Sequence, residues 1–168
     1  FVPVNLEQVA RDVISDLEVS LARSKGRVEL GELPALEGDR TQLGQLLQNL
    51  IGNAIKFHRP GVPPVVRVWG EVETRGGRPW VLLRVADNGI GFEEKYLQRI
   101  FEPFERLHGR SEYEGSGMGL AICRKIVQRH GGEITAESRV GEGTTFLVAL
   151  PQVHLDEQEA ERTEERQK

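Results

Sequence analysis

The stretch QNLIGNAIKF occupies residues 48–57 and ends a predicted helix that opens after Asp39. Apolar side chains recur along this segment at three- and four-residue steps: Leu43, Leu46, Leu47, Leu50, Ile51, Ala54 and Ile55. A stripe with this period is typical of a helix that buries one face, and aspartate is a favourable N-cap residue. The polar side chains of Asn49, Asn53 and Lys56 lie outside the apolar stripe, with the two asparagines one turn apart on one helix face.

Helices and strands alternate on both sides of this segment. Apolar spacing predicts further helices over residues 6–23, after an Asn5 cap, and 118–129, and a short helix is expected around residues 93–99. Strands are predicted at residues 28–30, 35–37, 66–72, 80–86, 134–138 and 144–150, of which the last four form two hairpins. No repeated strand–helix–strand unit occurs. We therefore predict an α+β fold, a two-layer α/β sandwich whose helices pack on one face of a mixed, largely antiparallel sheet.

Length and composition exclude several classes of protein. A chain of 168 residues has the size of one domain, which we expect to cover residues 1–151 before a charged tail at 152–168. Residues 154–168 hold six of the 26 acidic and three of the 22 basic residues, so the remainder is nearly neutral. A nucleic-acid binder usually carries a basic surplus. The sequence has no apolar run of the roughly 18 residues that a membrane span requires and only one cysteine, Cys123. These features fit a cytoplasmic domain without direct membrane contact.

Three glycine clusters follow in order: DNGIGF at residues 87–92, GSGMGL at 115–120 and GEGTTF at 141–146. Glycine lets backbone N–H groups approach a phosphate or a base without side-chain interference, although each cluster alone has the alternative of an ordinary turn. GSGMGL also opens a predicted helix, whose N-terminus suits polyphosphate. No strand leads directly into it and it lacks a Gly-Lys-Ser/Thr ending, which excludes a Rossmann fingerprint and a Walker loop.

The order of these motifs resembles that of the ATP-binding catalytic domain of two-component sensor histidine kinases, within the gyrase, heat-shock chaperone and mismatch-repair ATPase superfamily. The resemblance covers residues 1–151. QNLIGNAIKF is similar to the asparagine box, DNGIGF to the first glycine box, IFEPFERL at 100–107 to the phenylalanine box, and the other two clusters to later glycine boxes. The resemblance implies a sandwich of the Bergerat type that binds ATP and Mg²⁺.

The resemblance assigns the metal and phosphate contacts to the helix that ends at QNLIGNAIKF. Asn53, together with Asn49, resembles the asparagines that hold Mg²⁺, an ion that keeps most of its waters and needs only one or two protein oxygens besides phosphate. Lys56 is expected to meet phosphate as a point charge. The alternatives are buried, hydrogen-bonded asparagines and a solvated lysine at the helix end.

Asp87 resembles the aspartate that accepts the exocyclic amine of adenine. Guanine presents a carbonyl oxygen at that place, so a carboxylate there selects adenine. Thr144 or Thr145 is expected to support Asp87 through a hydroxyl, directly or through water. The resemblance adds the following nucleotide-binding residues: Gly89, Gly91, Gly115, Gly117, Met118, Gly119 and Leu120.

The segment 105–116 is polar, contains glycine and is longer than most connections in a compact domain. We expect a lid that orders when nucleotide binds, with Arg106 at its root reaching the terminal phosphate. Phe101 and Phe104 have two readings, as core residues or as anchors of this lid. The four histidines, at positions 58, 108, 130 and 154, lack the context of a phosphoacceptor, and we expect surface positions for all four.

The resemblance implies a protein-histidine kinase domain that binds MgATP and donates the γ-phosphate to a histidine on a separate dimerisation and phosphotransfer domain of the same parent protein. A response regulator is expected downstream. Asn49 favours this function over a hydrolase of the superfamily, because the hydrolases place a glutamate general base there. Two alternatives stay open: such an ATPase, and a nucleotide-binding regulatory module without turnover. The parent protein is either soluble or membrane-anchored.

Overall fold

The computed structural model describes residues 1–97, 99–102 and 119–154. Along the chain the elements are β1 (Val2–Val4), α1 (Leu6–Asp16), α2 (Glu18–Ser24), β2 (Arg27–Leu30), β3 (Leu36–Gly38), α3 (Arg40–Lys56), β4 (Val65–Arg75), β5 (Arg78–Asp87), the 3₁₀ turn η1 (Glu94–Tyr96), α4 (Gly119–Arg129), β6 (Glu133–Arg139) and β7 (Gly143–Pro151). None of the helices in these described segments is long and apolar enough to cross a membrane.

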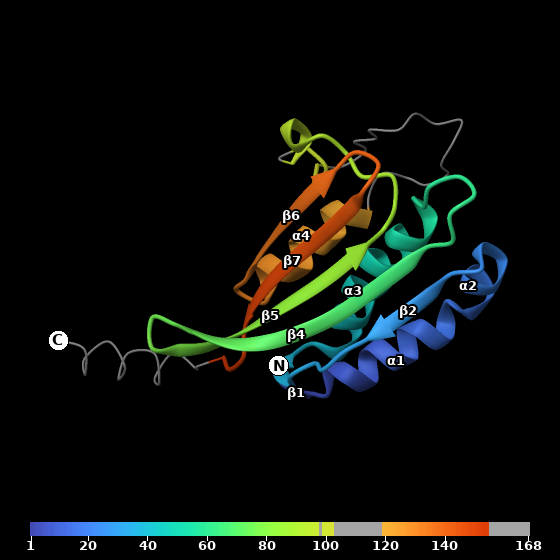
Figure 1. Ribbon diagram of the computed structural model, residues 1–168. Coiled ribbons are helices and arrows are strands. Elements are labelled where there is room, and N and C mark those ends of the chain that lie inside the picture. Colours follow the sequence, from blue (N-terminus) through green and yellow to red (C-terminus); the bar gives the residue numbers. More distant parts are fainter. Residues whose placement is uncertain (98, 103–118, 155–168) are drawn as a thin grey trace.

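The described strands form one five-stranded sheet in the order β2-β4-β5-β7-β6 and a separate pair, β1-β3. β2 runs parallel to β4, and the other neighbours in the large sheet are antiparallel. The helices α1, α3 and α4 lie together on one side of this sheet (Figure 1), and their apolar side chains join the inward side chains of the strands in one core. The predicted α+β sandwich with a mixed, largely antiparallel sheet is confirmed.

Helix α3 is the centre of the core, as its apolar stripe predicts. All seven stripe residues are buried, and five of them have no exposed surface. The helix begins where Asp39 caps it, with the side-chain Oδ1 accepting a 3.0 Å hydrogen bond from the Gln42 amide. Asn5 caps α1 in the same way through the Gln8 amide. Both predicted caps are confirmed.

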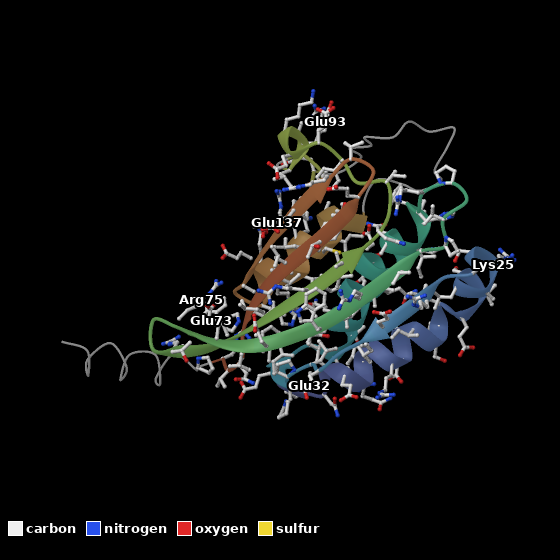
Figure 2. All side chains as sticks on the ribbon, in the orientation of Figure 1. Lys25, Glu32, Glu73, Arg75, Glu93 and Glu137 are labelled. Atoms are coloured by element: carbon white, nitrogen blue, oxygen red, sulfur yellow. The ribbon has the colours of Figure 1, made fainter. Side chains whose placement is uncertain are left out.

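At the edge strand β6 the face of the sheet opposite the helices is polar. β6 alternates buried Ile134, Ala136 and Ser138 with exposed, mostly charged residues. Beyond the sheet's centre the β4–β5 hairpin extends outward (Figure 1), and Glu73 and Arg75 lie close together near its tip (Figure 2), with a 3.0 Å ion pair between their side chains. An exposed ion pair of this kind contributes at most about 1 kcal/mol, so it keeps the tip solvated and adds little stability.

Two sequence predictions of helices are wrong in extent, and one strand was missed. The single helix expected over 6–23 is two helices, because the backbone leaves the helical path at Leu17, with ψ at 8°, and both Leu17 and Leu21 then pack against the core. The helix expected around 93–99 is only the 3₁₀ turn η1, which no side chain caps. Strand β1 was not predicted; it pairs with β3, far along the chain, so its stabilising contacts are not local.

The loop after β5 packs by backbone against the turn between β6 and β7. Gly91 has a φ of 65°, and a Cβ there would overlap the Arg139 carbonyl; a Cβ at Gly143 would overlap the Asp87 carbonyl. The amide of Gly141 donates to the Ile90 carbonyl at 2.7 Å and joins the two loops. The DNGIGF and GEGTTF loops therefore hold each other in position. In the described structure Gly91 allows the two backbones to approach this closely.

We expect Gly91→Ala to lower the free energy of unfolding by at least about 3 kcal/mol, because it adds both a left-handed backbone penalty and a backbone overlap. Gly61→Ala is the matched control. Gly61 has a φ of 74° but no atom within 4 Å of its would-be Cβ, so we expect a cost of only about 1 kcal/mol. Urea denaturation of both variants measures the difference, and equal costs would contradict the packing role.

Candidate nucleotide-binding site

Asp87 ends the central strand β5 with its carboxylate held by two backbone amides. Oδ1 accepts hydrogen bonds from the Gly89 amide at 2.8 Å and from the Thr144 amide at 3.2 Å. Among the described residues no donor contacts Oδ2. The carboxylate therefore has a fixed orientation and one oxygen left for a donor from outside.

Burial raises the pKa of Asp87 to about 6, although the hydrogen bonds from Gly89 and then Thr144 lower it in part. The charged form is thus poorly compensated in the empty domain. A ligand that brings an N–H donor to Oδ2 would supply the missing interaction. This is the property that an adenine-reading carboxylate needs.

The loop that carries Asp87 is also tied to the end of α3. The Ile90 amide donates to the Phe57 carbonyl at 3.0 Å, and Gly89 leaves no room for a side chain against that carbonyl. Arg59 Nε donates to the Asn88 carbonyl at 2.8 Å, and Asn88 Oδ1 accepts from the Val65 amide at 2.9 Å. Sequence reasoning missed the roles of Arg59 and Asn88, because their hydrogen-bond partners lie 29 and 23 residues away along the chain.

The two threonines of GEGTTF have different surroundings. Thr144 is buried and contacts Asp87 through its amide, while its hydroxyl bonds to Ser138 Oγ at 2.7 Å. Thr145 is the next residue on the same strand, so its side chain lies on the opposite sheet face. Sequence reasoning missed Ser138, whose Oγ also accepts from the Phe92 amide at 2.9 Å and thereby joins the β6–β7 hairpin to the first glycine cluster.

Asn49 lies where α3 meets the beginning of α4. Its Oδ1 is 3.8 Å from the point where a Cβ on Gly119 would stand, and its Nδ2 is buried without a hydrogen-bond acceptor of ordinary geometry among the residues that the structure describes. The neighbouring Cys123 thiol is fully buried, and burial raises its pKa to about 12, which a contact with Asn49 lowers in part. The thiol is therefore not nucleophilic, and an unsatisfied amide points to a polar partner at this junction.

Asn53 and Lys56 follow on the same helix. Both are partly exposed, and the Asn53 backbone carbonyl accepts the Phe57 amide while no side-chain hydrogen bond of Asn53 is seen among the described residues. Lys56 Nζ lies 5.4 Å from the centre of the Phe57 ring. An amide oxygen with no protein partner and a nearby cation fit a hydrated Mg²⁺ with phosphate better than they fit a closed structural network.

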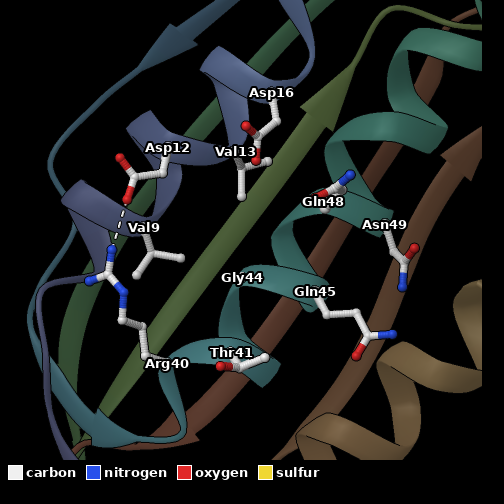
Figure 3. Close-up of a pocket in the computed structure, with 10 residues that line it drawn as sticks. All are labelled: Val9, Asp12, Val13, Asp16, Arg40, Thr41, Gly44, Gln45, Gln48 and Asn49. Carbon is white, nitrogen blue, oxygen red and sulfur yellow. Dashed lines mark hydrogen bonds and ion pairs between the residues drawn. The ribbon is translucent and has the colours of Figure 1, made fainter.

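A polar groove of about 590 Å³ lies between α1 and α3 (Figure 3). Val9 and Val13 form its apolar part, and an ion pair of 2.7 Å joins Asp12 to Arg40 across it. Asn49 lines the groove, whereas Asp87 is not among its lining residues. It connects to the candidate site only through Asn49.

The start of α4 is the last part of the site. Gly119 and Leu120 open this helix, and Leu120 packs against the core. A Cβ on Gly119 would stand 3.8 Å from Asn49 Oδ1, so the first described turn of α4 lies beside Asn49. Several predicted site residues lie outside the described residues: Phe104, Arg106, Gly115, Gly117 and Met118, together with the expected lid at 105–116.

Phe101 is buried, with its ring centre 6.2 Å from that of Phe146, which confirms its core reading.

Residues 38–154 match the family described as "Histidine kinase-, DNA gyrase B-, and HSP90-like ATPase". The chain belongs to this family. It is 42% identical over 147 residues to the phytochrome-like protein Cph1 of Synechocystis sp., covering 88% of this chain and 19% of Cph1. It is 33% identical over 162 residues to the circadian input-output histidine kinase CikA of Synechococcus elongatus, covering 92% of this chain and 21% of CikA.

The fold agrees with these relationships. The mycobacterial sensor histidine kinase MprB superposes with a TM-score of 0.75 at 28% identity, over 91% of this chain and 98% of that one. The expected kinship with the catalytic, ATP-binding domains of sensor histidine kinases is confirmed. The chain spans about a fifth of the length of the curated relatives Cph1 and CikA.

The raised pKa of Asp87 predicts a pH-dependent stability in the empty domain. The folded state takes up the proton more readily than the unfolded state, so the free energy of unfolding falls as pH rises from about 4 to about 6. Asp87→Asn removes the buried charge while its Oδ1 still accepts the two amides. We expect the variant to lose this pH dependence and to be about 2 kcal/mol more stable than the wild type at pH 7. Denaturant titrations at pH 4 to 8 measure both effects, and parallel pH profiles would contradict the assignment.

Proposed function

We propose that this chain binds MgATP and donates the γ-phosphate to a histidine on a separate dimerisation and phosphotransfer domain of the same parent protein. A response regulator then receives the phosphoryl group, in the cytoplasm. The observation that carries the proposal is the partly buried Asp87 carboxylate, fixed by two amides and open at one oxygen among the described residues, on the same domain as Asn49 of α3, which lies beside Gly119 of α4.

Adenine recognition follows from the state of Asp87. The exocyclic amine of adenine is a donor and finds an acceptor at Oδ2, whereas the carbonyl oxygen of guanine would face another acceptor. Because the site is buried, an acceptor facing an acceptor costs about 1–3 kcal/mol or more. The amides of Gly89 and Thr144 hold the carboxylate in place, so the selection needs no rearrangement of the empty site.

The polyphosphate and the metal belong to the junction of α3 and α4. The N-terminal amides of α4 and Lys56 offer positive charge to the phosphates. The side-chain oxygens of Asn49 and Asn53 would hold Mg²⁺, which when bound neutralises the phosphate charge and aligns the terminal group. Arg106 is proposed to contact the same terminal phosphate.

The acceptor imidazole brings its own lone pair, so this domain needs no strong base. The amide of Asn49 cannot take a proton from water, because an amide is not basic near neutral pH. The protein's part in the reaction is therefore to bind, orient and neutralise charge. The same property separates the proposal from an ATPase of the family, which must activate water.

The metal role of Asn53 gives a direct test. We expect Asn53→Ala to lower the affinity for ATP in the presence of Mg²⁺ by roughly tenfold and to leave the affinity without Mg²⁺ unchanged, because only the metal contact is lost. Gln48→Ala, an exposed polar residue on the same helix, is the matched control and should leave both affinities unchanged. Calorimetry with and without Mg²⁺ measures the four values. An unchanged Mg²⁺ effect in Asn53→Ala would make this side chain structural.

Phosphoryl transfer is tested with labelled ATP. The chain alone should release phosphate very slowly, because among its described residues no acceptor histidine and no base for water is placed at the proposed phosphate end. Adding the cognate dimerisation domain in trans should give an acid-labile, base-stable label on that partner, and Arg106→Ala should weaken the labelling. Rapid phosphate release by the chain alone would favour an ATPase. Nucleotide binding without transfer or release would favour a regulatory module.

A further inference from the structure

His130 is buried at the far end of α4 from the candidate site. The expectation of a surface position is wrong for this histidine, since none of its surface is exposed. Its ring stacks on Phe1, with ring centres 4.5 Å apart and planes 11° from parallel, and the His154 ring lies 6.4 Å away at a steep angle. A ring packed on its face in this way has a fixed plane.

The local sequence Arg129-His130-Gly131-Gly132 fixes where the ring stands on the helix. The Gly132 amide donates to the Val127 carbonyl and the Gly131 amide to the Gln128 carbonyl, both at 2.9 Å, with Gly131 at a φ of 76°. This is the Schellman ending of a helix, and it makes His130 the last residue of the helical path. The side chain therefore leaves α4 at its very end, toward α3.

Both ring nitrogens of His130 are used. Nδ1 lies 2.8 Å from the Ile126 carbonyl, which can only accept, so Nδ1 carries the proton. Nε2 then accepts the Asp39 amide at 3.0 Å. Asp39 is the N-cap of α3, so one neutral imidazole joins the end of α4 to the beginning of α3.

The contacts between α3 and α4 share one antiparallel register. His130 meets Asp39 at one end, the Cys123 thiol lies 3.9 Å from the Leu46 carbonyl in the middle, and Gly119 lies beside Asn49 at the other end. Along α3 the first two contacts, from Asp39 to Leu46, are seven residues apart, and along α4 they are also seven residues apart, from His130 back to Cys123. The thiol contact is a weak hydrogen bond, and the proximity of Gly119 to Asn49 is known only from the 3.8 Å between Asn49 Oδ1 and the place where a Cβ on Gly119 would stand. The bond from Asp39 to His130 is therefore the strongest directional constraint of the three.

We propose that His130 is a positioning residue for the polyphosphate end of the site: through the hydrogen bond from the Asp39 amide, it sets how far along α3 the N-terminus of α4 lies, and so places Gly119 against Asn49. A slip of one residue would move the α4 amides by about 1.5 Å. That displacement is enough to break hydrogen bonds to phosphate but does not reach Asp87, which β5 and β7 hold. This inference rests on the proposed binding of MgATP.

The proposal predicts that His130 affects the affinity for the phosphates but not the affinity for the base, and three variants test it. His130→Gln places an acceptor near the position of Nε2 and keeps the bond from Asp39, whereas His130→Asn places a donor near Nδ1 and keeps only the bond to Ile126. His130→Phe keeps the ring that stacks on Phe1 and neither bond, and serves if His130→Asn does not fold. Calorimetry with MgATP and with adenosine separates the phosphate contribution from the base contribution.

We expect His130→Gln to bind both ligands like the wild type. His130→Asn and His130→Phe should bind MgATP roughly tenfold more weakly or worse while adenosine affinity is unchanged, as loss of correctly placed phosphate donors predicts. Hydrogen exchange of the Asp39 amide, measured without nucleotide, should be slow in the wild type and His130→Gln and faster in the other two.

The outcomes distinguish the possible failures. Equal losses for adenosine and MgATP would show that His130 only supports the fold. Wild-type MgATP affinity in a folded variant whose Asp39 amide exchanges quickly would show that the bond does not position α4. A wild-type chain that binds no MgATP would instead overturn the proposed function, and the exchange of the Asp39 amide would still decide whether the bond exists.

Discussion

The end of β5 is enclosed by backbone on two sides, and the arrangement of the site depends on that enclosure. Gly89 faces the Phe57 carbonyl at the end of α3, and Gly91 faces the Arg139 carbonyl at the β6–β7 turn. Peptide groups in regular elements cannot swing aside as a long side chain can, so the loop has one path between them. Asp87 consequently stands in one orientation. The same few residues also fix the position of α3 relative to the β6–β7 hairpin.

Much of this architecture was predictable from local sequence. The apolar period of α3 and its Asp39 cap predicted a buried helix, and alternating valines before Gly76-Gly77 predicted the β4–β5 hairpin; both are confirmed. Asp87 was singled out by the resemblance of DNGIGF, residues 87–92, to the first glycine box of the family. Each of these signals lies within a window of a few residues, where side-chain period and backbone freedom decide the structure.

Other features depend on partners far along the chain and left no readable local pattern. His130 was expected at the surface because it lacks the context of a phosphoacceptor, yet its partner is the amide of Asp39, 91 residues earlier. Ser138 was not singled out in the sequence. Its role follows only from the loop that reaches it, through the Phe92 amide. Tertiary packing decides such positions, and propensity does not.

The poorly compensated charge of Asp87 connects recognition to the lifetime of the protein. Under the proposed adenine contact, the empty domain bears a desolvation cost that a nucleotide relieves, so its folded population rises with nucleotide concentration by mass action. Proteases act on the opened state, which means that an unliganded copy would be degraded sooner than a liganded one. The carboxylate that is proposed to distinguish adenine from guanine would thus make the cellular abundance of the domain sensitive to the supply of the proposed nucleotide.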